Sequence, residues 1–153
     1  CKAVNIPVIA AGGIATGRQM LAAMVLGAEG VQMGSRYVAS EEASSHSNFK
    51  QLVIRSNEGD TKLMLKQLAP VRLLKNEFYR QVQEAEDRGA SKEELQALLG
   101  RGRAKKGMFE GDLETGELEI GQVSALIRDI LPAATITQQI WDEFQEALKN
   151  PLA

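Results

Sequence analysis

The chain contains few of the residues that reveal a protein's chemistry most directly. Among its 153 residues there are one cysteine, one histidine, one tryptophan and four prolines. Because Cys1 has no partner, an internal disulfide is excluded, and we interpret it as a small apolar residue ahead of a strand. His46 has no second histidine or metal-ligand spacing beside it, so we predict a capping or surface role rather than catalysis.

The composition also lacks a strong charge imbalance and a long apolar run. A net charge of −2 argues against a general affinity for nucleic acid, and no apolar run reaches the ~18 residues of a membrane span. The first residues do not have the pattern of a signal peptide. With 44% hydrophobic and 25% charged residues, it is typical of an ordinary cytoplasmic protein, and we expect neither nucleic acid nor a membrane as a partner.

The N-terminal part predicts a strand that ends in a glycine turn and leads into a helix. Ile6–Ala10 is a short apolar run without alternation, which is typical of a parallel strand buried on both faces. Gly12 and Gly13 follow it and can adopt positive φ while leaving the main chain bare for an anion. Thr16 and Gln19 have the spacing of a capping box and predict the start of the connecting helix.

A second strand and a second turn follow after one βα repeat. Residues 30–33 form the short strand, and Gly34 and Ser35 stand at its end as Gly13 does at the end of the first. In a parallel barrel these ends lie side by side, so the N–H groups of both turns and the Ser35 hydroxyl can share one phosphate. The dinucleotide and nucleotide-triphosphate glycine motifs are absent. The structural alternative is a pair of glycine turns kept for tight packing alone.

Four segments resemble a known family. They read VIAAGGIATG, LGAEGVQMGSRYVASEEASSH, PVRLLKN and GDLETGELEIGQVSALI. They are similar to the C-terminal part of the nitronate monooxygenases (2-nitropropane dioxygenases), which share their fold with the FMN-dependent enoyl-acyl-carrier-protein reductases. The resemblance implies FMN as the cofactor, whereas the residues alone indicate only an anion. It also implies that the FMN phosphate is held by Ala11, Gly12, Gly13, Gly34 and Ser35, and that the Gly121-Gln122 element lies near the flavin.

The predicted fold class is α/β. We expect the last two βα units of a (β/α)₈ TIM barrel in residues 1–57 and a mainly helical extension in residues 58–153, with a short hairpin near 107–121. A complete barrel needs ~200 to 250 residues. We therefore expect the 153 residues to be the C-terminal portion of a longer protein. A lone pair of parallel strands has open edges, so a homo-oligomer is also an expectation.

Helical patterns dominate the chain beyond residue 39. We predict helices over about 40–57, 74–88, 91–106, 122–130 and 135–148. In the hairpin, Leu118 and Ile120 are expected to point inward and the glutamates toward water, and the acidic run lacks the ligand pattern of a calcium loop. The last helix has a buried stripe of Ile136, Ile140, Phe144 and Leu148.

Two sets of polar residues have a structural and a functional interpretation. Arg72 and Asn76 belong to a recurring family element, for which a salt bridge or a cap is the favoured role. Four cations cluster at Arg101, Arg103, Lys105 and Lys106. They are interpreted as a solvated face at a helix end, with contact to an acyl carrier protein or a nicotinamide nucleotide as the alternative.

The predicted function follows from the resemblance. The parent protein is expected to use FMN to oxidise alkyl nitronates with dioxygen, and this chain supplies the phosphate-binding turns without catalytic residues or a metal site and is inactive alone. The first alternative is an NADH-dependent flavin enoyl-acyl-carrier-protein reductase, whose small-molecule substrate is an enoyl thioester instead of a nitronate. The alternative from another class is a non-catalytic helical interaction or dimerisation module.

Overall fold

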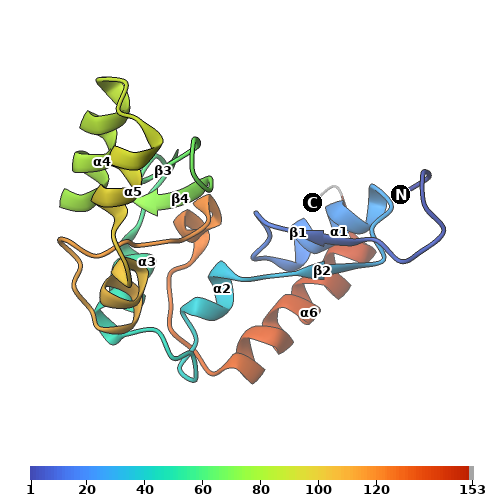
Figure 1. Cartoon of the computed structure of the whole chain (residues 1–153). Helices are drawn as coiled ribbons and strands as arrows, with labels where there is room; N and C mark the ends of the chain where they lie inside the picture. Colours follow the sequence, from blue (N-terminus) through green and yellow to red (C-terminus); the bar gives the residue numbers. More distant parts are fainter. Residues whose placement is uncertain (152–153) are drawn as a thin grey trace.

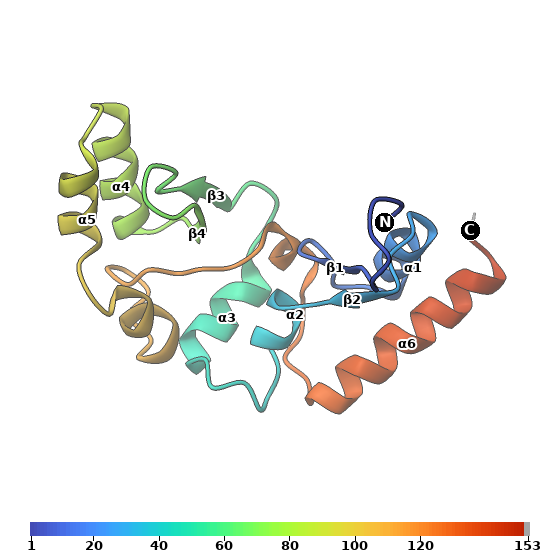
Figure 2. The same ribbon diagram turned by 45° about the vertical axis from the view of Figure 1, so that its right-hand side comes forward.

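The computed structural model describes residues 1–151 and shows an elongated α/β molecule with two lobes (Figure 1). One lobe contains β1, β2, α1 and α6, and the other contains β3, β4, α4 and α5. Helices α2 and α3 lie between the lobes, as the turned view in Figure 2 also shows. The two cavities considered below lie where the strand ends of the first lobe face the connecting segments.

The first lobe is a single parallel βαβ unit with a second helix packed against it. β1 (Ile9–Ala11) pairs in parallel with β2 (Gly30–Gln32), and α1 (Gly17–Val25) connects them. The predicted capping box at the start of α1 is confirmed. The C-terminal helix α6 (Ala133–Lys149) crosses α1 very closely, because a Cβ on Gly17 would lie 2.2 Å from the main-chain nitrogen of Phe144.

The prediction that the first strand is buried on both faces is wrong for this chain. Ile6 lies outside the strand and is 68% exposed, and Ile9 within β1 is 53% exposed. The physical reason is that β1 pairs with β2 alone among the described residues, in a sheet of two strands. The apolar sequence is typical of a buried parallel strand, but β2 is the only strand that pairs with β1 among residues 1–151.

The remaining elements form the connection and the second lobe. In chain order they are α2 (Ser35–Val38), α3 (Ser47–Arg55), β3 (Thr61–Met64), β4 (Val71–Leu74), α4 (Glu77–Asp87), α5 (Lys92–Leu99), the π-helix η1 (Lys105–Phe109) and the 3₁₀-helix η2 (Gln122–Leu126). β3 and β4 form an antiparallel pair, with Thr61 opposite Leu74. Phe78 and Val82 of α4 pack with Leu73 and Leu95 in a buried core.

Three predicted helices have different limits in the structure. The helix expected from residue 40 begins at Ser47, because His46 caps α3 and Ser40 instead pairs with Leu131 in an isolated parallel bridge. The helix expected to reach residue 106 ends at Leu99, where Gly100 has a φ of +65°. The helix expected over 122–130 is the short 3₁₀-helix η2.

The predicted hairpin near 107–121 is also wrong. The main chain of residues 117–120 runs beside β4, where Leu74 donates to the carbonyl of Leu118 at 2.9 Å and Ile120 donates to that of Arg72 at 3.1 Å. Leu118 and Ile120 are buried as predicted, but Glu117 is buried with them rather than facing water. A long-range strand partner therefore replaces the local one that the glycine spacing had suggested.

The C-terminal helix confirms most of its predicted stripe. Ile136, Ile140 and Phe144 are buried, whereas Leu148 is half exposed. Within residues 1–151, no helix is both long and apolar enough to cross a membrane. The same part of the chain holds no group of three or more His, Cys, Asp or Glu side chains placed to bind a metal ion.

Candidate functional site

The two glycine turns meet at one cavity of about 280 Å³. It lies at the carboxyl ends of β1 and β2, which are side by side in the parallel pair. All five residues singled out from the sequence line it, namely Ala11, Gly12, Gly13, Gly34 and Ser35. The structure thus brings together every predicted site residue.

The glycines leave open space in front of the main chain. Gly12 and Gly13 have φ values of +88° and +72°, a region that side chains disfavour. A Cβ built on either residue, or on Gly34, would meet no atom within 4 Å. These glycines are therefore not explained by tight packing, and the bare backbone faces room that a ligand group can fill.

Ser35 is oriented by a residue far away in the sequence. The N–H of Gly121 donates to Ser35 Oγ at 3.0 Å, and a Cβ on Gly121 would stand only 2.8 Å from that oxygen. With its oxygen accepting this bond, the hydroxyl can still donate its proton into the cavity. Gly121 and Val123 also line the cavity. Only the family resemblance pointed to Gly121, and no sequence signal indicated Val123.

The start of α1 is already occupied by groups of the chain itself. Gly17 N–H donates to Glu143 Oε2 at 2.7 Å, and Gln19 N–H donates to Thr16 Oγ1 at 3.2 Å. The Gln19 side chain in turn accepts from the N–H of Ala15 at 2.8 Å. An anion in the cavity would therefore be held by the turns and by the end of β2, where short α2 begins, rather than by the α1 terminus.

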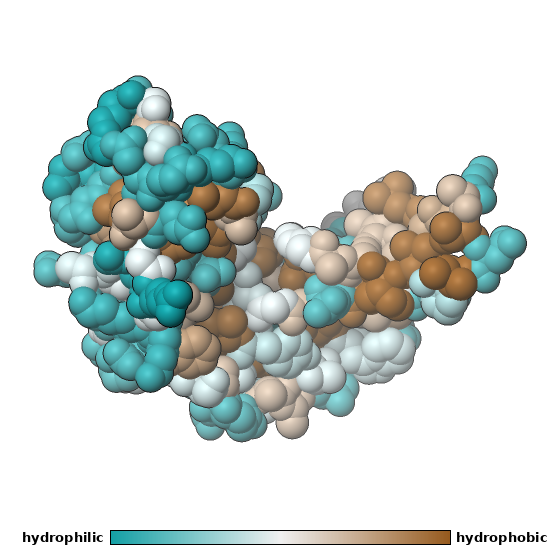
Figure 3. Space-filling view, in the orientation of Figure 1, coloured by the Kyte–Doolittle hydropathy of each residue, from teal (hydrophilic) through white to brown (hydrophobic). Residues whose placement is uncertain are grey.

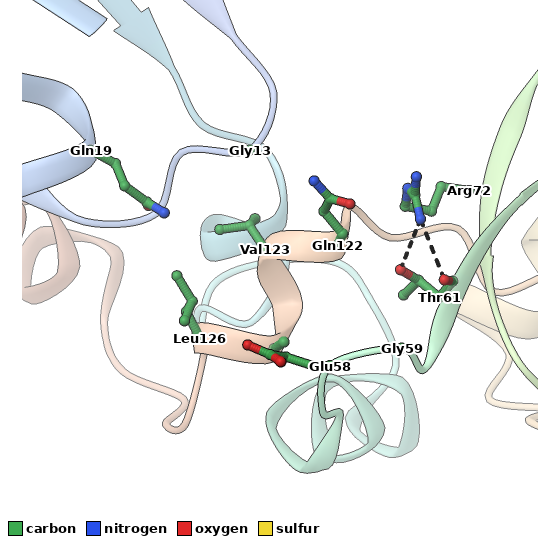
Figure 4. A pocket seen from close by; sticks show the side chains of 10 residues that line it. Gly13, Gln19, Glu58, Gly59, Thr61, Arg72, Gln122, Val123 and Leu126 are labelled. Atoms are coloured by element: carbon green, nitrogen blue, oxygen red, sulfur yellow. Dashed lines mark hydrogen bonds between the residues drawn. The ribbon is translucent and has the colours of Figure 1, made fainter. Parts of the chain in front are cut away.

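A second, larger cavity of about 410 Å³ adjoins the first and shares Gly13 and Val123 with it (Figure 4). Its walls come from both lobes. They are formed by Gly13, Gln19, Glu58, Gly59, Thr61, Arg72, Gln122, Val123, Ala125 and Leu126. Ligand sites commonly have about 300 to 1,000 Å³, so this volume is sufficient for a small organic molecule.

The predicted structural role of His46 is confirmed. It is the N-cap of α3, and its Nδ1 accepts from the N–H of Asn48 at 3.1 Å. Its ring packs against Gly111, where a Cβ would lie 2.3 Å from Nδ1. His46 lines neither of the two cavities.

Other polar side chains far from the turns are also used structurally. Asn76 is the N-cap of α4, as predicted. Within the cation cluster, Arg103 donates to main-chain carbonyls at 2.8 to 3.0 Å and stacks on Phe78, and Lys106 pairs with Asp112 at 2.9 Å. The cluster therefore differs from the predicted solvated face at a helix end, because α5 already ends at Leu99 and Arg103 binds the main chain.

A parallel βαβ unit with glycine turns around a cavity at its strand ends defines a class, the α/β enzymes that bind ligands at the carboxyl ends of parallel strands. Within that class, the family model described as nitronate monooxygenase matches residues 1–143. The chain belongs to the nitronate monooxygenase family.

Individual relatives agree with this assignment. The chain is 35% identical over 134 residues to a probable nitronate monooxygenase of Staphylococcus saprophyticus, covering 87% of this chain and 38% of that protein. A probable nitronate monooxygenase of Staphylococcus haemolyticus is 50% identical over 58 residues, which are 38% of this chain and 16% of the relative. The chain therefore spans well under half of these relatives.

Solved structures share the fold. FabK from Thermotoga maritima matches with a TM-score of 0.90 and 41% identity, over 98% of this chain and 48% of that one. Nitroalkane oxidase from Streptomyces ansochromogenes matches with a TM-score of 0.78 and 29% identity, over 97% and 42%. The chain thus has the fold of about half of each of these two solved chains.

Proposed function

We propose that this chain holds the phosphate of FMN in a flavin-dependent oxidoreductase, at Ala11, Gly12, Gly13, Gly34 and Ser35. The observation that carries the proposal is the meeting of all five residues at one cavity with open space before three of them. Main-chain N–H groups and one hydroxyl suit a phosphate, since each can donate a charge-assisted hydrogen bond. The parallel strand pair is then the C-terminal part of a (β/α)₈ barrel.

The reaction that we propose for the whole protein is the oxidation of alkyl nitronates by dioxygen. FMN, when bound, supplies the redox chemistry. The residues of this chain bind and orient it, and Val123 and Gly121 close the cavity from the side of the second lobe. We infer that the chain alone does not turn over substrate, because no residue at the glycine turns is an acid or a base.

Replacing Gly34 by Ala tests the phosphate site without disturbing the fold. Gly34 has a φ of −98°, which any residue can adopt, and the added methyl meets only open space. It therefore fills the cavity without backbone strain. FMN affinity, measured by flavin fluorescence, is expected to fall by about ten- to a hundredfold as charge-assisted hydrogen bonds are displaced, while the unfolding midpoint is unchanged.

Riboflavin is the matched control ligand, because it lacks the phosphate. Riboflavin should bind the unmodified chain more weakly than FMN does. Its affinity should be the same for the unmodified chain and for the Gly34→Ala variant. Equal binding of FMN by both proteins, or equal binding of FMN and riboflavin by the unmodified chain, would contradict the proposal. No flavin binding at all would favour the non-catalytic helical module.

The second candidate is an enoyl-acyl-carrier-protein reductase that uses NADH. The 41% identity and the TM-score of 0.90 to FabK favour it. Anaerobic mixing of the flavin-loaded full-length protein with NADH, and separately with an alkyl nitronate, distinguishes the two reactions. Bleaching of the flavin absorption by NADH alone supports the reductase, and bleaching by the nitronate alone supports the oxidation.

A further inference from the structure

Among residues 1–151, Arg72 is the only arginine or lysine that lines the larger cavity. It lies on β4, and its Nη1 donates to both the carbonyl oxygen and the Oγ1 of Thr61, each at 3.3 Å (Figure 4). Thr61 lies on the neighbouring strand β3, so one edge of the guanidinium is fixed to the antiparallel pair. Thr61 thus orients the Nη1 end of the Arg72 side chain.

The other donors of Arg72 have no acceptor among residues 1–151. No carboxylate in that range lies within 4.0 Å of it, and no hydrogen bond from its Nη2 or Nε is present. Arg103 contrasts with it, since its Nε, Nη1 and Nη2 all donate to carbonyls. Every nitrogen of the Arg103 guanidinium therefore donates to the chain, whereas only Nη1 of Arg72 does.

The charged side chains of the cavity differ between its two ends. Figure 4 shows the Gln122 amide on the same side as Arg72, whereas Glu58 lies beneath η2 with its carboxylate toward Leu126. An oxyanion near Glu58 would be repelled, while a planar guanidinium offers parallel N–H donors to phosphate or carboxylate. Gln122 can add a donor from its amide nitrogen, which points toward Gly13 in Figure 4.

We infer that Arg72, positioned by Thr61 and assisted by Gln122, binds an oxyanion group of a second ligand beside the flavin. The group is a phosphate or a carboxylate, and the rest of the molecule fills the 410 Å³ cavity toward Gly13. This inference rests on the proposed function, because the shared walls Gly13 and Val123 place the second ligand next to the flavin phosphate.

The test follows the arginine Nε–H signals in ¹⁵N–¹H spectra of the full chain. The Arg72 signal is identified by its loss in an Arg72→Lys variant. The chain is titrated with inorganic phosphate and, separately, with acetate at constant ionic strength, before and after saturation with FMN. The Arg72 signal is expected to shift saturably with at least one anion, while the Arg103 signal, whose donors are already used, stays in place.

A Thr61→Val variant provides a second measurement. It removes the hydroxyl acceptor and keeps the β-branched shape, so the anion should bind several-fold more weakly while the chain stays folded. A response to phosphate but not acetate supports a phosphorylated ligand, and a response to acetate but not phosphate supports a carboxylic acid.

Three outcomes overturn the inference. They are no shift of the Arg72 signal with either anion, equal shifts of the Arg72 and Arg103 signals, and a shift caused by FMN itself with no further response to the anions. The last would assign Arg72 to the flavin site. Failure of FMN to shift the Gly12, Gly13 and Gly34 amides would instead refute the proposed function, and the Arg72 titration of the flavin-free chain would still decide this inference.

Discussion

The Glu117 carboxylate is buried between the second lobe and the segment that leads to the cavities. Burial raises its pKa to about 6, with a further increase from the charge of Glu119 and an opposing decrease from Arg103. The folded state therefore holds the proton more tightly than the unfolded chain, whose glutamates titrate near 4.5. The contribution of the protonated Glu117 to stability is therefore fully present below pH 4.5 and is lost as the pH rises through 6.

This pH dependence predicts the effect of Glu117→Gln. The neutral amide avoids the cost of a buried charge, so the variant should lack the part of the pH dependence that Glu117 causes, about 2 kcal/mol at most. Urea unfolding of both proteins at pH 4.5 and pH 7 measures it. Measured relative to the unmodified chain, the variant should have a higher free energy of unfolding at pH 7 than at pH 4.5. An equal difference at both pH values would mean that this carboxylate is solvated.

At the residue scale, the sequence predicted the glycine turns that line the smaller cavity but not the contribution of Val123. Gly12, Gly13 and Gly34 could be identified because a requirement for bare backbone is expressed directly as glycine. The bond between Gly121 and Ser35 joins residues 86 positions apart, and no local spacing encodes it. Glu117 is buried beside Arg103 and Gly107, whose approach to it also depends on the tertiary fold.

At the element scale, His46 determines where α3 begins. Its Nδ1 caps the helix, and its main-chain N–H donates to the carbonyl of Met108 at 2.8 Å. His46→Ala should therefore lower the free energy of unfolding by about 0.5 to 2 kcal/mol, and His46→Asn should restore most of it, because asparagine is a good N-cap. Urea unfolding near neutral pH measures both. A variant with alanine that is as stable as the unmodified chain would show that the cap does not contribute.

The crossing of α1 and α6 depends on Gly17. A Cβ there would lie 2.2 Å from the nitrogen of Phe144 and 2.4 Å from the carbonyl oxygen of Ile140, and backbone atoms cannot move aside as a side chain can. Gly17→Ala is expected to cost about 3 kcal/mol or more. Thermal unfolding measures the loss, and Gly34→Ala is the matched control because its methyl meets no atom. Equal midpoints for the two variants would contradict the close crossing.

Element starts were predicted better than element partners. The capping box at Thr16 could be predicted because the capping residue and its partner are three positions apart, and Ser91 and Glu94 form a second box with the same spacing. The segment 117–120 was assigned to a hairpin, although its partner is β4. Periodicity and caps describe local order, whereas strand pairing is decided by residues that are distant in the sequence.

At the scale of the whole molecule, the first lobe exposes an unusual amount of apolar surface. Figure 3 shows hydrophobic residues gathered over the lobe that contains β1 and β2. The exposed large apolar side chains of residues 1–26 are Val4, Ile6, Ile9, Val25 and Leu26. Apolar patches of this kind, beside a strand pair with unpaired edges, favour association with another surface.

We therefore predict that the isolated chain self-associates through this face. Light scattering coupled to size exclusion should give a mass that rises with concentration, and replacing Ile6 and Ile9 by Lys should weaken the association about tenfold or more, since each loses a buried apolar side chain. Phe109→Lys is the matched control, because Phe109 is also half exposed but lies in η1. A monomer at every concentration, or equal weakening by the control, would contradict the prediction. Self-association through this face would also indicate where further strands of a barrel bind. An edge that accepts a second copy offers the same unpaired main-chain groups to any parallel strand.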